Sequence, residues 1–160
     1  MLNVGDTYEF YSPVGQTLQE GDPISIYSAC NIEELDLSGC MHCALKVDLS
    51  RINSDSIGNS LKKLIMNGEN EALTNTTFTG TNALTRLEYL DIQGMHALGS
   101  LDLSNSLNLK TLLAKNSGLT EVTLAPGCLI ERLELPATTA AVILEDLPLL
   151  TSDNLILEGN

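Results

Sequence analysis

One apolar pattern recurs along the second half of the chain and constrains the fold more than any other feature. Each unit has an apolar residue, two residues of any kind, a second apolar residue, one further residue and a third apolar residue, as in Leu87-Glu-Tyr-Leu90-Asp-Ile92. The central apolar residue recurs at steps of eleven, eleven, ten and eleven residues, at Leu90, Leu101, Leu112, Val122 and Leu133. A short repeat of nearly constant length predicts a solenoid, in which each unit stacks on an earlier one.

The spacing within one unit indicates a β-strand. Its last two apolar residues lie two apart, so both point to one face of an extended chain, and the residue between them points to the other face. Ten or eleven residues are too few for a strand, a helix and two turns, but they are enough for one strand and one turn. Alternate units therefore belong to opposite sides of a flattened coil of about 21–22 residues.

The expected fold is thus mainly β, a solenoid with two parallel sheets. The polar loop at 51–60 and the polar connection at 67–81 predict longer coils in the N-terminal half, with Leu73 and Phe78 able to reach the core. One sheet is expected to contain Leu35, Leu64, Leu90, Leu112, Leu133 and Leu155. The other is expected to contain Val47, Leu101, Val122 and approximately Ile143.

Residues 1–30 differ in kind from residues 31–160, which carry the repeats. Four of the six aromatic residues lie in this first segment, and its Thr-Tyr-Glu-Phe-Tyr run alternates as a strand does. The end of a solenoid exposes its core unless another segment covers it. We therefore expect residues 1–30 to form a partly β N-terminal cap over the first coil, with a linker from an upstream domain as the alternative.

The charge of the chain narrows the classes of partner. There are 21 acidic and 8 basic residues, which give a formal net charge of −13. Such a chain is repelled by nucleic-acid phosphates and by anionic membranes. No apolar run approaches the ~20 residues of a membrane helix, and the first basic residue is Lys46, so the basic start of a signal peptide is missing. The location stays open: a virion or cell surface if the chain is a fragment or a phage protein, and otherwise the cytoplasm.

Four cysteines raise the question of a metal site. Cys40 and Cys43 form the one close pair, with His42 between them and with Cys30 and Cys128 as the other candidate ligands. A strong zinc signal needs two such pairs. We therefore favour buried thiols that pack as small apolar residues, with zinc as the alternative, and we expect no cofactor.

No catalytic motif accompanies the repeats. The two histidines, His42 and His96, stand near no serine or cysteine nucleophile in a known context, and the phosphate-binding and nucleophile-elbow motifs are absent. Asp36 and Asp91 would be the acids of a calcium site, but the predicted register places Ile65 between them. We therefore expect a protein that is not an enzyme.

The outward side chains of the first sheet provide a check on this register. The position after the first apolar residue reads Glu33, Lys62, Glu88, Lys110, Glu131 and Asp153, so the charge alternates until the last unit. The position between the two inward residues alternates between acidic and aliphatic from Asp36 to Ile156. Neighbouring strands lie ~4.8 Å apart, where opposite charges attract. Both patterns favour these six strands as neighbours in this order.

The same outward side chains form the candidate binding face. A solvated sheet face with scattered apolar residues is the alternative interpretation. A row of outward aliphatic and aromatic residues can also form a contact patch for a partner. The face comprises Glu33, Asp36, Lys62, Ile65, Glu88, Tyr89, Asp91, Lys110, Leu113, Glu131, Arg132, Glu134 and Ile156.

The array resembles the leucine-rich repeat family. Residues 32–40 (IEELDLSGC) and 98–106 (LGSLDLSNS) are similar to its L-x-x-L-x-L-x-x-(N/C) signature, and the resemblance covers about residues 32–157. The Leu-Asp-Leu-Ser-Asn sequence is similar to short repeats in surface proteins of gut Bacteroides-type bacteria and in virion proteins of their phages. The ninth position departs from the family, since only Cys40 matches it, so other groups must satisfy the turns. The resemblance implies recognition of a protein or ligand, without catalytic residues.

Two function classes follow from these observations. The first is a non-enzymatic leucine-rich repeat module for protein or surface-ligand recognition, as part of a larger protein or assembly. The alternative is a structural component of a phage virion or cell-surface fibre, in which the solenoid is a scaffold. The repeats continue to the last residues without a polar capping segment, so a neighbouring chain or domain is expected at the C-terminal end.

Overall fold

The computed structural model describes residues 32–38, 46–48, 61–67, 77–81, 84–139, 141–143 and 146–157, with only the backbone at 46–48, 77–79 and 141–143. The expected N-terminal cap at 1–30 lies outside these residues, as do the loop at 51–60 and the cluster formed by Cys30, Cys40, His42 and Cys43.

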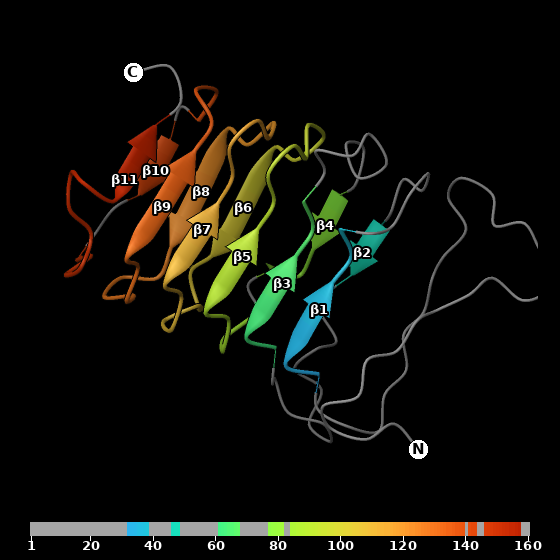
Figure 1. The fold of residues 1–160 in the computed structure, drawn as a ribbon, viewed down its shortest axis with the longest axis horizontal. Coiled ribbons are helices and arrows are strands. Elements are labelled where there is room, and N and C mark those ends of the chain that lie inside the picture. The colour runs from blue at the N-terminus through green and yellow to red at the C-terminus, as the bar shows by residue number, and fades with distance from the viewer. Residues whose placement is uncertain are drawn as a thin grey trace, which may run out of the picture.

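The described residues form short parallel β-strands, and none of them lies in an α-helix. Successive strands alternate between the two sides of a flattened coil (Figure 1). The strands are β1 (Glu34–Asp36), β2 (Lys46–Asp48), β3 (Lys63–Ile65), β4 (Thr77–Thr79), β5 (Tyr89–Asp91), β6 (Ser100–Leu103), β7 (Thr111–Leu113), β8 (Glu121–Leu124), β9 (Arg132–Leu135), β10 (Ala141–Ile143) and β11 (Leu155–Leu157).

The odd-numbered strands form one parallel sheet in the order β1-β3-β5-β7-β9-β11. Its central residues are aligned across all six strands, as predicted: Leu35, Leu64, Leu90, Leu112, Leu133 and Leu155. The flanking outward position also follows the predicted order, because Asp36 lies beside Ile65 and Ile65 beside Asp91. The structure therefore confirms the parallel solenoid and the register of this sheet.

The even-numbered strands on the opposite side differ from the prediction in three ways. The order β10-β8-β6 aligns Val122 with Val142, not with Ile143. Residues 140–144 are apolar at every position, so the alternation that reveals strand register is missing there. Among the described strands, β2 is hydrogen-bonded only to β4, so Val47 does not join this sheet. The connection at 67–81 contains strand β4, whose Thr-Phe-Thr composition favours a strand despite its polarity.

The lengths of the coils agree with the prediction. The hydrogen-bonded side chains of Glu33 and Lys62 are 29 residues apart in the first coil. In the second half the corresponding separation is 22 residues between Glu88 and Lys110, and 21 residues between Gly99 and Thr120. The extra residues of the N-terminal coils fall in connections between strands, so the sheet itself stays in register.

The core lies between the two sheets and consists of stacked aliphatic side chains. Leu64, Leu90, Leu112 and Leu133 enter it from the first sheet with no more than 1% of their surface exposed. Leu101, Leu103, Val122 and Leu124 enter it from the second sheet. Burial of one leucine side chain contributes about 2 kcal/mol, so the repeated leucines are the main source of stability.

Aspartates at the strand ends satisfy backbone groups in several turns. In each case the carboxylate accepts the backbone N–H two residues later, a local bond that favours a turn. The donor and acceptor pairs are Ser38 with Asp36 (2.9 Å), Gln93 with Asp91 (3.1 Å) and Ser104 with Asp102 (3.0 Å).

Serine and threonine hydroxyls satisfy carbonyl groups in other turns. Several of these bonds join one coil to the previous one, so they also hold the stack in register. The donors and acceptors are Ser106 with the Leu84 carbonyl (2.8 Å), Ser117 with Ala114 (2.7 Å), Thr120 with Gly99 (2.6 Å), and Thr138 and Thr139 with Leu119 (3.0 and 3.1 Å). Three of these donors, Ser106, Ser117 and Thr138, stand at the ninth position of their repeat units.

We expect Leu112→Ala to lower the free energy of unfolding by about 3 kcal/mol, because it leaves a cavity in the middle of the core. The matched control is Leu107→Ala, since Leu107 is 55% exposed in a turn; this change should cost less than about 0.5 kcal/mol. Urea unfolding followed by circular dichroism measures both values. Similar losses for the two variants would contradict the assignment of the core.

A second prediction concerns the close approach of two coils at Gly118. Its N–H donates to the Met95 carbonyl at 3.0 Å, and a Cβ atom at this position would lie 1.9 Å from the backbone oxygen of His96. Gly118→Ala should therefore cost about 2 kcal/mol, as overpacking does. Gly99→Ala is the control, because nothing lies within 4 Å of its Cβ position. Equal melting temperatures for the two variants would show that the coils do not meet here.

Candidate functional site

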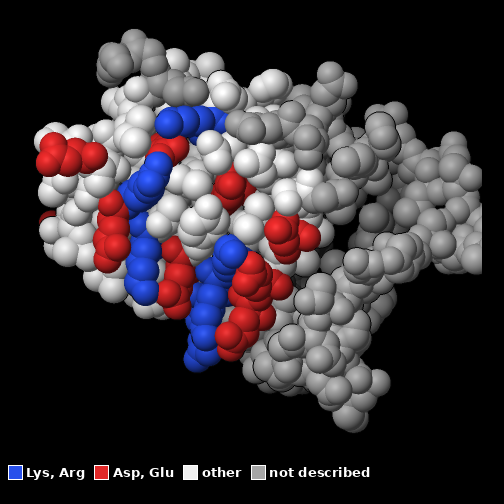
Figure 2. Space-filling model, viewed as in Figure 1, with Lys and Arg blue, Asp and Glu red and all other residues white. Residues whose placement is uncertain are grey.

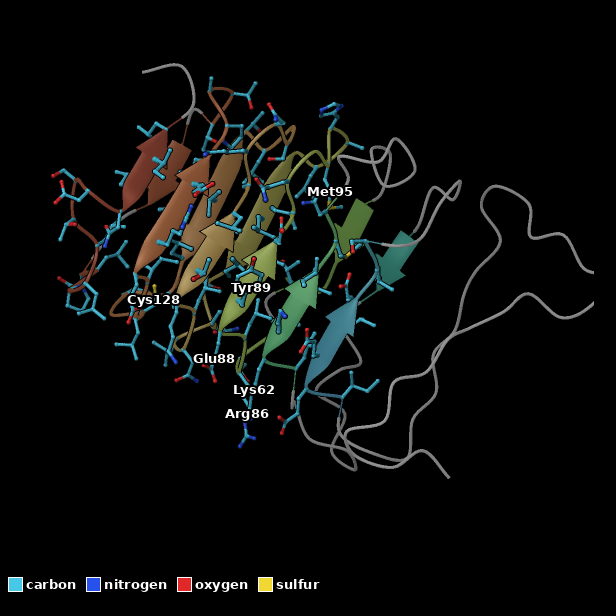
Figure 3. All side chains as sticks on the ribbon, viewed as in Figure 1. Lys62, Arg86, Glu88, Tyr89, Met95 and Cys128 are labelled. Atoms are coloured by element: carbon cyan, nitrogen blue, oxygen red, sulfur yellow. The ribbon has the colours of Figure 1, made fainter. Side chains whose placement is uncertain are left out.

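The candidate face is the outward surface of the six-stranded sheet, on which side chains stand in rows across the strands. Figure 3 places Tyr89 on β5 near the middle of this surface, with Lys62 and Glu88 at the starts of β3 and β5. Figure 2 shows basic and acidic residues side by side in adjacent bands on the same surface. The sheet order brings the thirteen predicted residues to one side of the molecule or its edge.

The first row lies at the starts of the strands and consists of exposed ion pairs. Lys62 Nζ lies 3.0 Å from Glu33 Oε2, and Lys110 Nζ lies 2.7 Å from Glu88 Oε2. The hydrogen bond from Lys110 lowers the pKa of Glu88 below its ordinary value, and the same bond raises the pKa of Lys110. The charge alternation in the sequence therefore corresponds to ion pairs between adjacent coils.

The second row contains residues that the sequence analysis did not single out. Lys63 Nζ lies 2.5 Å from Glu34 Oε1, and it also lies over the ring of Tyr89, 5.8 Å from the ring centre. The hydrogen bond to Glu34 raises the pKa of Lys63. The signal for these residues was present, because Glu34 and Lys63 occupy the same repeat position one coil apart.

Tyr89 is the aromatic centre of the face. Partial burial raises the pKa of its hydroxyl, and the charges of Asp91, Lys63, Arg132 and Glu134 act on it as well. The charged side chains that act on this half-buried tyrosine therefore come from β3, β5 and β9.

Glu134 lies on the outward side of β9, between the two inward leucines, but its neighbours bury it. Only 2% of its surface is exposed. Arg132 donates to Oε1 through Nε (2.7 Å) and through a terminal nitrogen, and Lys115 Nζ lies 3.2 Å from Oε2. The aliphatic residues Leu113 and Ile156 flank it on the neighbouring strands and keep water away. Glu134 therefore binds two basic side chains of the face, Arg132 and Lys115, through one carboxylate.

Asp91 is the second acidic residue of the candidate face that is largely buried. It is 7% exposed, and it lies between Ile65 and Leu113 in the sheet. Its Oδ1 accepts hydrogen bonds from the backbone and side chain of Gln93, and the Asn67 amide lies 3.5 Å from Oδ2. Its carboxylate is therefore occupied by the turn after β5, and Asp36 bonds Ser38 in the same way.

The remaining predicted residues keep their place on the accessible surface. Ile65, Leu113 and Ile156 are half-buried, while Glu131 and Arg132 are exposed. Five basic residues on this surface take part in ion pairs with its acids, and they are Lys62, Lys63, Lys110, Lys115 and Arg132. These bases pair with four acids, Glu33, Glu34, Glu88 and Glu134, so the face carries much less net negative charge than the whole chain, which carries −13.

The described residues present no metal-binding cluster of three or more histidine, cysteine or acidic side chains. Cys128 is buried in the core, where burial raises the pKa of its thiol. His96 is exposed in a turn. Nor does the described part of the chain contain a helix long and apolar enough to span a membrane.

Comparison of the chain with models of protein families gave no match, and neither did comparison with curated proteins or with solved structures.

The third prediction follows from Glu134. Burial alone would raise its pKa, but the hydrogen bonds and charges of Arg132 and Lys115 outweigh burial and hold the pKa below its ordinary value of 4.5. Such a group stabilises the folded state above its unfolded pKa, and this contribution is lost as pH falls through the folded pKa. Glu134→Gln should therefore cost about 1–3 kcal/mol at pH 7, and the difference from the wild type should shrink below about pH 4.5.

Urea unfolding at several pH values tests this expectation. The control is Glu131→Gln, an exposed residue just before β9, which should cost less than about 0.5 kcal/mol at every pH. A Glu134 effect that does not change with pH would show that packing, and not the charge, is responsible.

Proposed function

We propose that this protein is a non-enzymatic recognition module of the leucine-rich repeat type, which binds a protein or surface ligand through the outward face of the six-stranded sheet. The observation that supports this most is the arrangement around Tyr89, a half-buried aromatic ring between a cation and a set of paired charges. Aromatic residues in such positions dominate the energy of many protein interfaces.

The alternation of acidic and basic side chains on the face supports a partner that carries the complementary order of charges. Acids and bases follow one another from coil to coil at the spacing of the strands. A partner with the complementary order of charges would be steered and oriented by them, whereas a uniformly charged partner would be repelled by half of the side chains. Ile65, Leu113 and Ile156 would supply the apolar contacts between these charges.

The fixed side chains also favour recognition over a merely solvated surface. Glu134 holds Arg132 and Lys115 in place, and Glu34 holds Lys63 near the Tyr89 ring. Side chains that are already ordered lose less conformational entropy when a partner binds. The six strands beneath them provide a rigid support.

A structural role in a virion or cell-surface fibre is the second candidate. The feature that favours it is the last coil, where Leu147, Leu150 and Leu155 are only partly buried. Such a scaffold would use the end of the solenoid, so changes to the flat face would leave it unaffected.

The fourth prediction is that Tyr89→Ala removes binding of the partner. The immobilised chain and its variants would capture proteins from extracts of the source organism, and quantitative mass spectrometry would compare the amounts. A partner of this face should fall at least ten-fold with Tyr89→Ala, and also with Arg132→Ala. It should be retained by Thr123→Ala, a half-buried outward position on the opposite sheet.

Circular dichroism and melting temperature would establish that each variant is folded. Captured proteins that are the same for all three variants, or that are lost only with Thr123→Ala, would contradict the proposed binding face.

A further inference from the structure

The buried carboxylate of Glu134 is shared by two basic residues, which distinguishes it from the other ion-paired acids of the face. Three lysines of the face each pair with one acid of an adjacent coil. Glu134 instead accepts hydrogen bonds from Arg132 at Oε1, and Lys115 Nζ lies 3.2 Å from its Oε2. Two positive charges therefore meet one negative charge at this point of a chain that carries −13.

Arg132 presents this excess positive charge to solvent. Its side chain is 57% exposed, whereas that of Lys115 is 34% exposed. Its Nε and Nη2 atoms both donate to Oε1 of Glu134, and these two atoms form one edge of the planar guanidinium group. The other edge consists of Nη1 and the second hydrogen of Nη2. No described residue accepts a hydrogen bond from that edge.

The open edge of the Arg132 guanidinium fits a carboxylate. A carboxylate accepts two parallel hydrogen bonds from such an edge, which a lysine ammonium cannot provide. Glu134 fixes the plane of the guanidinium, and Lys115 fixes Glu134 from the other side. A side chain that is already ordered loses less conformational entropy when it binds.

Neighbouring acids favour a carboxylate over a phosphate. Glu131 is exposed directly before Arg132, and Asp153 is exposed shortly before β11 on the adjacent coil. A phosphate monoester carries more than one negative charge, so these acids repel it more strongly than a carboxylate. The same two acids attract a base. The ligand that fits therefore has an acidic and a basic group close together, as the surface of a protein does.

The open edge lies beside the aromatic centre of the face. Thr111 is the register neighbour of Arg132, and Tyr89 is the register neighbour of Thr111. Both are half-buried on the outward side of the sheet, and the charge of Arg132 acts on the Tyr89 hydroxyl. A carboxylate at Arg132 would therefore have these hydroxyl donors nearby.

We propose that Arg132 selects the partner of this face by binding one of its aspartate or glutamate carboxylates, and that Glu134 positions the guanidinium for this contact. This inference rests on the proposed function, because it names the group of the partner that the face around Tyr89 receives. Glu134 is a positioning residue: it is buried and acts through Arg132.

The fifth prediction uses two acetylated tripeptide amides, Glu-Gly-Lys and Gln-Gly-Lys, which differ in one carboxylate. Each is titrated into the isotope-labelled 160-residue chain, and the backbone amide shifts of Thr111 and Arg132 report binding by NMR. The glutamate peptide should have an about ten-fold lower dissociation constant, as expected for charge-assisted hydrogen bonds. Inorganic phosphate should bind no more tightly than the glutamine peptide.

Variants of the chain separate position from charge. Arg132→Lys keeps the charge but loses the planar edge, so it should weaken binding of the glutamate peptide about five-fold. Glu134→Gln makes the chain less negative, so a simple charge effect would tighten binding, whereas loss of positioning should weaken it. The matched control is Arg86→Lys in the exposed turn before β5, which should change nothing. Circular dichroism establishes folding, and the exposed Arg132→Lys variant decides the matter if Glu134→Gln is unfolded.

Three results would overturn the proposal: equal binding of the two peptides, unchanged binding by Arg132→Lys, and phosphate binding as tight as that of the glutamate peptide. The proposed function has a separate test. If the peptides bind equally but Tyr89→Ala still removes a captured partner, the binding face stands and the role of Arg132 is excluded. If Arg132 distinguishes the peptides but Tyr89→Ala leaves capture unchanged, the role of Arg132 is supported and the proposed face is contradicted.

Discussion

The alignment of inward leucines from coil to coil is the constraint on which the rest of the structure depends. Each strand is only three or four residues long, too short to be stable by itself. The strands persist because every coil places its leucines on those of the coil before it, which buries them between two sheets. The outward side chains inherit their positions from this alignment, so the order of the candidate face is a consequence of the packing of the core.

The polar groups of the solenoid are satisfied by short local bonds. Aspartates at the ends of strands accept backbone N–H groups, and serine and threonine hydroxyls bond carbonyl groups of their own or the preceding coil. These residue types compete well for backbone groups in turns. An acidic residue at the end of a strand can therefore satisfy the turn or bind a partner. The carboxylate of Asp91 satisfies the turn.

Two surfaces of different kinds result from the same stacking. The flat face of the six-stranded sheet has paired charges around Tyr89, held by Glu134 and its two cations. The end of the stack at β11 has two exposed acids, Glu131 and Asp153, near leucines that are only partly buried. The proposed partner, with a complementary order of charges, would bind the first of these surfaces.

The sequence by itself determined the parallel solenoid, the order of the six strands and the row of ion pairs, because the leucine spacing and the charge alternation are local and repeat from coil to coil. It failed where that signal is weak: β10 is apolar at every position, and β4 lies in a stretch that is mostly polar. Only the tertiary structure decided that Asp91 and Glu134 are buried, because their burial depends on aliphatic residues of neighbouring strands that are some 20 residues away in the chain. It also decided that Lys63, Lys115 and Glu34 belong to the face, since ion pairs across coils form only once the strands are side by side.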